Sequence, residues 1–239
     1  MKKLIFLLLP TVMLLLTGCA STNTQLQQPL PSNARVGVVA FMPAPFFIST
    51  SPIVNTLGEV FESQHKYPTI QHSIKGYDMS RLTTQAVANQ LKQSGSYQIV
   101  PLYYNYKSDP DSFVQSAIRS KHLAYVIEIE PGVYSKAIGN SYVTAPGYGI
   151  LYTYHFGFVI NSYPVARAYA DVIVTVMNHQ QQTLASDSVT ADKELRESKW
   201  KDKFSQLNPK DIAGFKNWFS QEVIPAVANK AVQMVNVAH

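Results

Sequence analysis

The sequence predicts an α/β (α+β) fold, in which a mixed sheet of about five or six strands carries helices packed on it. Three observations favour this class. Continuous apolar runs such as Arg35–Phe41 (RVGVVAF) are typical of buried strands. Segments with apolar residues every three or four positions, such as residues 78–95, predict amphipathic helices between these runs. The same periodicity over residues 208–236 predicts a long C-terminal helix.

The expected order of elements is β–α–β–α–β–β–β–α, and the sequence has no internal repeat. Asp78 or Ser80 can cap the first helix and Gly95 can end it. Pro110 suits the first turn of the second helix. Residues 42–79 are expected to form a long irregular insertion, because several prolines interrupt them. Further strands are expected at residues 97–102, 123–130, 165–177 and 183–190.

The C-terminal helix has clear boundary signals. Asn208 can cap it, Pro209 suits its first turn, and Asp211 lies near its positive end. Pro225 lies inside the periodic segment and has no backbone N–H to donate. We therefore expect Pro225 to kink this helix or to split it in two.

The chain begins with MKKLIFLLLPTVMLLLTGCA, which has the features of an export signal. The apolar run Leu4–Leu16 is too short to span a bilayer, which needs roughly 20 residues. Leu16-Thr17-Gly18-Cys19 resembles the lipobox of bacterial lipoproteins, in which the cysteine is lipidated and becomes the new N-terminus. The resemblance implies a signal peptide over residues 1–18 and lipid on Cys19. Residue 20 is alanine and not aspartate, so the resemblance also implies that the protein is anchored at the periplasmic face of the outer membrane.

Residues 19–33 are expected to be the lipidated cysteine and a flexible tether, because Gln, Ser, Thr and Pro dominate them. Residues 34–239 are expected to form a single periplasmic domain. Cys19 is the only cysteine, so the domain has no internal disulfide. Removal of residues 1–18 takes away two lysines and lowers the formal charge from +5 to +3. This mild, dispersed charge does not favour nucleic acid as a partner.

Residues 147–160 (GYGILYTYHFGFVI) alternate strictly, and their even positions are aromatic or β-branched. Such alternation puts one kind of side chain on each face of a strand. The aromatic face could contact the protein's own core under the C-terminal helix, a neighbouring subunit, or lipid. We expect residues 134–164 to protrude and this face to contact a neighbouring subunit. The expected interface residues are Tyr148, Tyr152, Tyr154, Phe156 and Phe158.

Patterns for catalysis or metal binding are weak. Glu128 and Glu130 share a strand face, as paired carboxylates do, but a solvated face explains them better. Glu62 and His65, with His72 beyond, could hold a metal, although a third ligand motif is absent. The sequence contains no GxSxG, HExxH, P-loop or GxGxxG motif. We therefore predict a protein that is not an enzyme, with no catalytic residue, metal, cofactor or small-molecule substrate.

Four successive stretches resemble one shared module: RVGVVAF, RLTTQAVANQLKQSGSYQIVPL, DSFVQSAIRSKHLAYVIEIEPGVY and ADVIVTVMNHQQQTLASDSVT. The module is similar to the periplasmic α/β domain of CsgG-type curli-export lipoproteins, of LpoB-type activators of penicillin-binding proteins and of the N-terminal domain of TolB. The resemblance covers residues 35–41 and 78–190. It implies a mostly non-enzymatic protein that binds partners or builds assemblies at the outer membrane.

The chain departs from two of these families. LpoB-type activators carry a long Pro-rich tether, whereas the tether here has about fourteen residues. CsgG-type proteins contribute two membrane hairpins, and residues 134–164 stand where the first would lie. The charged residues 191–204 take the place of the second, and each Arg or Lys in lipid costs roughly 2–4 kcal/mol. In a pore, the aromatic strand would also need residues 133–143 or 165–177 as its return strand.

The favoured function is therefore a non-enzymatic interaction or assembly module, anchored in the outer membrane through lipid on Cys19. Its expected partners are copies of itself or other envelope proteins, within a secretion or appendage complex. The alternatives are a CsgG-like pore-forming export subunit and an LpoB-like regulator of peptidoglycan synthesis.

Overall fold

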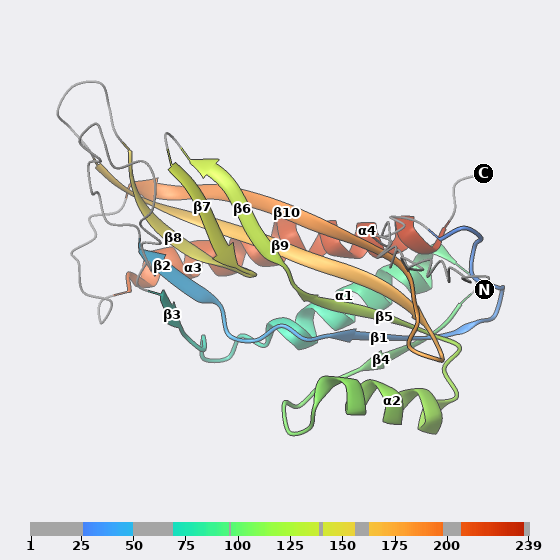
Figure 1. Ribbon diagram of the computed structural model, residues 1–239. Coiled ribbons are helices and arrows are strands. Elements are labelled where there is room, and N and C mark those ends of the chain that lie inside the picture. The colour runs from blue at the N-terminus through green and yellow to red at the C-terminus, as the bar shows by residue number, and fades with distance from the viewer. Residues whose placement is uncertain are drawn as a thin grey trace, which may run out of the picture.

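The computed structural model describes residues 26–49, 69–95, 97–138, 141–155, 163–197 and 207–236, and it confirms the α/β class (Figure 1). The strands are β1 (Arg35–Ala40), β2 (Phe46–Ser49), β3 (Thr69–Gln71), β4 (Gln98–Leu102), β5 (Tyr125–Pro131), β6 (Val133–Ile138), β7 (Ser141–Pro146), β8 (Tyr148–His155), β9 (Tyr163–Asn178) and β10 (Thr183–Glu197). The helices are α1 (Met79–Ser94), α2 (Pro110–Lys121), α3 (Pro209–Trp218), the π-helical η2 (Phe219–Val223) and α4 (Ile224–Val235).

The long strand β9 organises the sheet. β10 runs antiparallel along one edge of β9, while β5 and β8 share the other edge end to end. β1 lies parallel to β5, and β2 lies parallel to β8, with β4 and β3 as the outer strands. The described part of this sheet has eight strands instead of five or six. The difference arises because β2 and β3 form inside residues 42–79, which were expected to be irregular.

Most of the helices cover one face of the sheet, whereas α2 and the β6–β7 hairpin cover parts of the other face. α1, α3, η2 and α4 pack on the first face, where a row of alternate β9 residues lies in the largest apolar cluster. On the second face, α2 covers the part of the sheet formed by β1, β4 and β5. The antiparallel β6–β7 hairpin lies on that same face, over β8 and β9 (Figure 1). The helical face therefore holds most of the core.

The C-terminal helix starts as expected but does not split at Pro225. The Asn208 side chain accepts a hydrogen bond from the Lys210 N–H, and Pro209 occupies the first turn. Because Pro225 has no N–H, the helix cannot keep regular α-helical bonding around it. Instead η2 precedes α4, and the Ile224 N–H donates to Phe219 O, five residues earlier. The π-helical turn thus lets α3, η2 and α4 follow one another without a break.

The folded domain begins earlier than expected. Leu26 and Leu30 are only 6 % and 7 % exposed and belong to the main apolar cluster. The prediction of a flexible tether over residues 19–33 is therefore wrong from Leu26 onward, because these two leucines bury their side chains in the core. Residues 20–25 are left to link Cys19 to the domain, and at full extension they reach about 25 Å.

Candidate interaction surfaces

Tyr148 and Tyr152 lie on the helical face of the sheet. Both side chains are buried, and the Tyr148 ring lies 5.3 Å from the Phe219 ring. The Tyr148 hydroxyl donates to Pro43 O, and the Tyr152 hydroxyl donates to Asp211 Oδ2 at 3.3 Å. These two residues therefore belong to the protein's own core, and the prediction that they contact a neighbouring subunit is wrong. The reason is that α3 and η2 cover this part of β8.

The other three expected interface residues have a different status. The backbone of Tyr154 belongs to β8, but its side chain lies outside what the structure describes, as do Phe156 and Phe158. For these three residues the interface stays a prediction. Residues 133–143 and 165–177 were the two candidates for the strand that pairs with the aromatic strand. β8 pairs with β9 over Tyr148–His155 and Tyr163–Ala170, so the second candidate is its neighbour.

The β6–β7 hairpin packs against the sheet, although residues 134–164 were expected to protrude. Tyr134 is fully buried and its ring lies 5.0 Å from the Tyr169 ring. Val143 and Ala145 are buried on the same side of the hairpin. Lys136 reaches across to β10, where its Nζ lies 2.5 Å from Asp192 Oδ2. The prediction fails for this part of the segment because one face of the hairpin is apolar and is buried on β8 and β9.

Two Pro-Gly dipeptides hold the root of this hairpin at the point where β5 and β8 meet. The Gly132 N–H donates to Asp171 O (2.9 Å), the Gly147 N–H donates to Gly132 O (2.9 Å), and the Asp171 N–H donates to Gly147 O (2.7 Å). Gly147 has a φ of +50°, which favours glycine. The Asp171 carboxylate also accepts a bond from the Thr190 hydroxyl. Sequence reasoning missed this junction, although the repeated Pro-Gly pairs were a signal for turns.

β10 presents an open strand edge. It pairs with β9 on one side, and no described strand pairs with its other side. Its register is regular from Ala185 to Glu194, between two irregular positions. The Ser188 N–H donates to Asp187 Oδ1 at 2.8 Å, which indicates that this N–H does not point into the ladder with β9. Alternate residues of β10 thus direct their backbone groups toward the open edge.

The charged side chains that the structure describes on β10, from Asp187 to Glu194, are paired within the chain. The ion pairs are Asp187 with Lys230, Asp192 with Lys136 and Arg167, Glu194 with Arg167, and Lys193 with Glu222. Burial works against ionisation of Asp192, but hydrogen bonds from Lys136 and Arg167 outweigh it and lower the pKa of this carboxyl. Charged side chains commonly protect an edge strand from pairing. Here their charge is largely compensated within the chain, and Asp187 Oδ1 also accepts from the outward Ser188 N–H.

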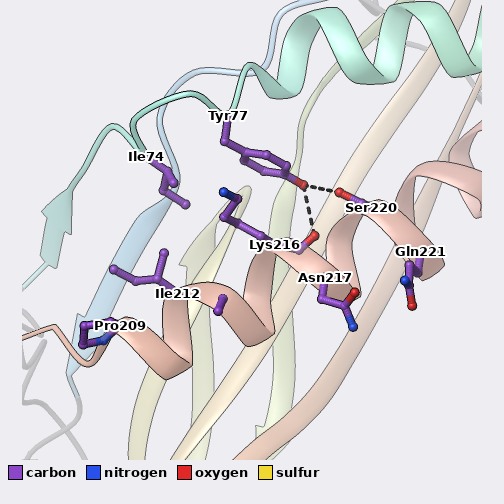
Figure 2. Close-up of a pocket in the computed structure, with 9 residues that line it drawn as sticks. Ile74, Tyr77, Pro209, Ile212, Lys216, Asn217, Ser220 and Gln221 are labelled. Carbon is purple, nitrogen blue, oxygen red and sulfur yellow. Dashed lines mark hydrogen bonds between the residues drawn. The ribbon is translucent and has the colours of Figure 1, made fainter.

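A groove of about 540 Å³ lies between the β3–α1 connection and the C-terminal helix (Figure 2). The Tyr77 hydroxyl donates to Lys216 O at 3.2 Å and lies 2.7 Å from Ser220 Oγ. The Lys216 ammonium lies 5.1 Å from the centre of the Tyr77 ring, as a cation–π pair does. Burial raises the pKa of Tyr77, and its bond to Ser220 acts against this. These polar groups satisfy one another, so the contacts tie the connection to α3 and η2.

Glu128 and Glu130 lie on the second face of the sheet, on β5. Burial, followed by the charges of Glu130 and Asp111, raises the pKa of Glu128 from 4.5 to about 7. Glu62 and His65 lie outside the described residues, within which no group of three His, Cys, Asp or Glu side chains could hold a metal.

The raised pKa of Glu128 predicts a pH-dependent stability. Above about 4.5 the folded state keeps a proton that the unfolded state has lost, so stability falls as pH rises from there to about 7. The Glu128→Gln variant lacks this titration. We expect it to raise the melting temperature more at about pH 8 than at about pH 5, which thermal unfolding by circular dichroism measures. Equal shifts at both pH values would contradict the assignment.

Comparisons with known proteins give distant structural similarity. No family model and no curated protein matches the chain. A dodecamer of a PelC point variant from Paraburkholderia phytofirmans has a TM-score of 0.34 and 11 % identity, over 85 % of this chain and 93 % of that one. A homologue of the neuraminyllactose-binding hemagglutinin from Helicobacter pylori has a TM-score of 0.39 and 7 % identity, over 87 % and 88 %. The hypothetical protein CT253 from Chlamydia trachomatis has a TM-score of 0.35 and 10 % identity, over 86 % and 99 %.

The described helices include none that is long and apolar enough to cross a membrane. The chain is similar to the three structures in the arrangement of its elements alone. The resemblance to CsgG-type, LpoB-type and TolB domains otherwise stays a prediction.

Proposed function

We propose that the chain is an outer-membrane lipoprotein, anchored through lipid on Cys19, whose α/β domain is a non-enzymatic assembly module. In this proposal the module associates with copies of itself and serves as a structural component of an envelope complex. Two features support it. The sequence ends its export signal in a lipobox-like Leu-Thr-Gly-Cys, and the packed domain begins at Leu26, close behind that cysteine.

The open edge of β10 is the observation that carries self-association. An unpaired strand edge offers a row of N–H and C=O groups to another strand. The other described outer strands are short, since β3 has three residues and β4 has five, including Pro101. The regular run of β10 from Ala185 to Glu194 is longer than both. A second β10, related by a two-fold axis, is therefore the strand that matches it in length.

The two alternatives draw less support from the described residues. A regulator that acts at a distance needs a long tether, and residues 20–25 reach only about 25 Å. A pore subunit needs residues from the 134–164 segment to leave the domain. The described part of that segment instead buries Tyr134, Tyr148 and Tyr152 within the domain.

Replacing Ser188 with proline is expected to convert the self-associated protein to monomers. The Ser188 N–H points away from β9 and is held by Asp187 Oδ1, so a proline ring in its place stands at the open edge and obstructs pairing with a second strand, while the ladder with β9 remains. Analytical ultracentrifugation of the mature chain carrying Cys19→Ser would measure the change. Ser188→Ala is the matched control and should associate as the parent does. If Ser188→Pro remains folded and associates as strongly as the parent, β10 is not the interface.

A further inference from the structure

Four connections meet at the end of the domain from which the tether leaves. The Gln98 N–H donates to Ala34 O, and the Ala124 N–H donates to Arg35 O, both at 2.9 Å. These bonds join the start of β4 and the residue before β5 to Ala34 and to Arg35, the first residue of β1. The Tyr97 hydroxyl donates to Asn236 Oδ1 at 3.1 Å, which brings in the end of α4. Figure 1 shows the segment before β1 and the end of α4 at this same end of the molecule.

The described residues at this end include exposed cations, and its four segments contain no acid. The exposed cations are Arg35, Lys92, Arg119 and Lys121. No Asp or Glu occurs in the segments that meet here, residues 26–35, 92–98, 119–125 and 230–236. Asp187 is held by Lys230 at 2.8 Å. Asp111 lies at the opposite end of α2, about 12 Å along the helix from Arg119, and its carbonyl oxygen accepts from Gln181 of the β9–β10 turn.

Helix dipoles explain only part of this pattern. Lys92 lies in the last turn of α1, and Arg119 and Lys121 lie in the last turn of α2, where cations are favourable. Arg35 opens a β-strand and has no such role. A dipole also gives no reason for acids to be missing from the segments before β1 and at the end of α4.

We propose that this basic end, defined by Arg35, Lys92, Arg119 and Lys121, docks on anionic phospholipid head groups of the membrane that holds the anchor. The inference rests on the proposed lipid on Cys19 for its setting. Residues 20–25 keep Leu26 within about 25 Å of the acyl chains, so the basic end can touch the surface. Cations are attracted to an anionic surface only within about a Debye length, roughly 8 Å. Side chains that touch the surface lie within this distance. Docking would fix which way the domain faces.

Vesicle binding of the unlipidated protein tests the proposal. The mature chain with Cys19→Ser is sedimented with phosphatidylcholine vesicles that contain or lack phosphatidylglycerol. We expect binding only with phosphatidylglycerol, weakened by added salt. Arg119→Gln with Lys121→Gln should lower the partition coefficient at least about tenfold, because each surface cation contributes a several-fold gain. Lys75→Gln with Lys210→Gln removes the same charge from exposed positions elsewhere and should change binding less than about twofold.

The outcomes separate this proposal from the anchor. Binding that does not depend on phosphatidylglycerol, or equal losses in both double variants, would overturn docking through the basic end. Palmitate labelling of the wild-type chain, with Cys19→Ser as the unlabelled control, tests the anchor independently. Absent labelling with intact vesicle binding would overturn the lipoprotein proposal and leave the basic end as a membrane-binding surface. Labelling without vesicle binding would support the lipid anchor on Cys19 and overturn docking through the basic end.

Discussion

Replacing Gly149 with alanine is expected to lower the free energy of unfolding by about 3 kcal/mol, at the upper end of the usual cost of overpacking. Gly149 faces Phe46 in the parallel pairing of β8 with β2. A Cβ at this position would lie 1.6 Å from the carbonyl oxygen of Phe46, which is backbone and cannot rotate away. We therefore expect β2 to be displaced and the buried Phe47 and Ile48 to lose packing.

Urea unfolding of the mature Cys19→Ser chain, followed by circular dichroism, measures this loss. Gly214→Ala is the matched control. Gly214 lies inside α3, where the atoms nearest to an added Cβ belong to the Leu195 side chain and lie at 3.4 Å or more. Alanine favours a helix over glycine by roughly 0.5–1 kcal/mol, so this control should be neutral or slightly more stable. Similar stabilities of the two variants would show that β2 does not pair with β8 as described.

Local patterns predicted the elements well where the signal lies in neighbouring residues. The alternation that starts at Tyr148 predicted a strand, which the structure describes as far as His155, and Asn208-Pro209 marked the start of the C-terminal helix. Alternation gives a strand two faces but does not say what covers each face. The partner of Tyr148 is Phe219, seventy-one positions away, and a local pattern carries no information on such a contact. Tyr148 and Tyr152 therefore suggested an interface, whereas both side chains are buried in the core.

The short strands β2 and β3, the buried leucines before β1 and the basic end depend on contacts between distant residues, which local sequence patterns do not predict. β2 and β3 have four and three residues and lie in a proline-interrupted segment, so their own propensities are too weak to predict them. They form because the edge of β8 supplies hydrogen-bond partners for β2, and β2 does so for β3. Leu26 and Leu30 stand alone among polar residues and gain their importance from the core into which they fold. Nor did composition identify the basic end, because its four cations are spread over residues 35–121.

Replacing Phe219 with alanine is expected to lower the free energy of unfolding by about 3–5 kcal/mol, the usual cost of deleting a buried aromatic ring. Phe219 is 1 % exposed, and its ring lies 5.3 Å from that of Tyr148 and 5.5 Å from that of Phe215. The residue also opens the π-helical turn that accommodates Pro225. Loss of the ring therefore removes contacts between β8 and the C-terminal helix at the place where that helix departs from regular bonding.

Leu82→Ala is the matched control for this variant, because Leu82 is also a large apolar residue on a helix but is 41 % exposed. We expect it to cost less than about 1 kcal/mol, as surface substitutions do. Urea unfolding of both variants in the Cys19→Ser background measures the difference. If Phe219→Ala costs no more than Leu82→Ala, the aromatic face of β8 is not covered by the C-terminal helix. The face would then be free for the subunit contact that the sequence predicts, so the same measurement decides between core and interface for Tyr148.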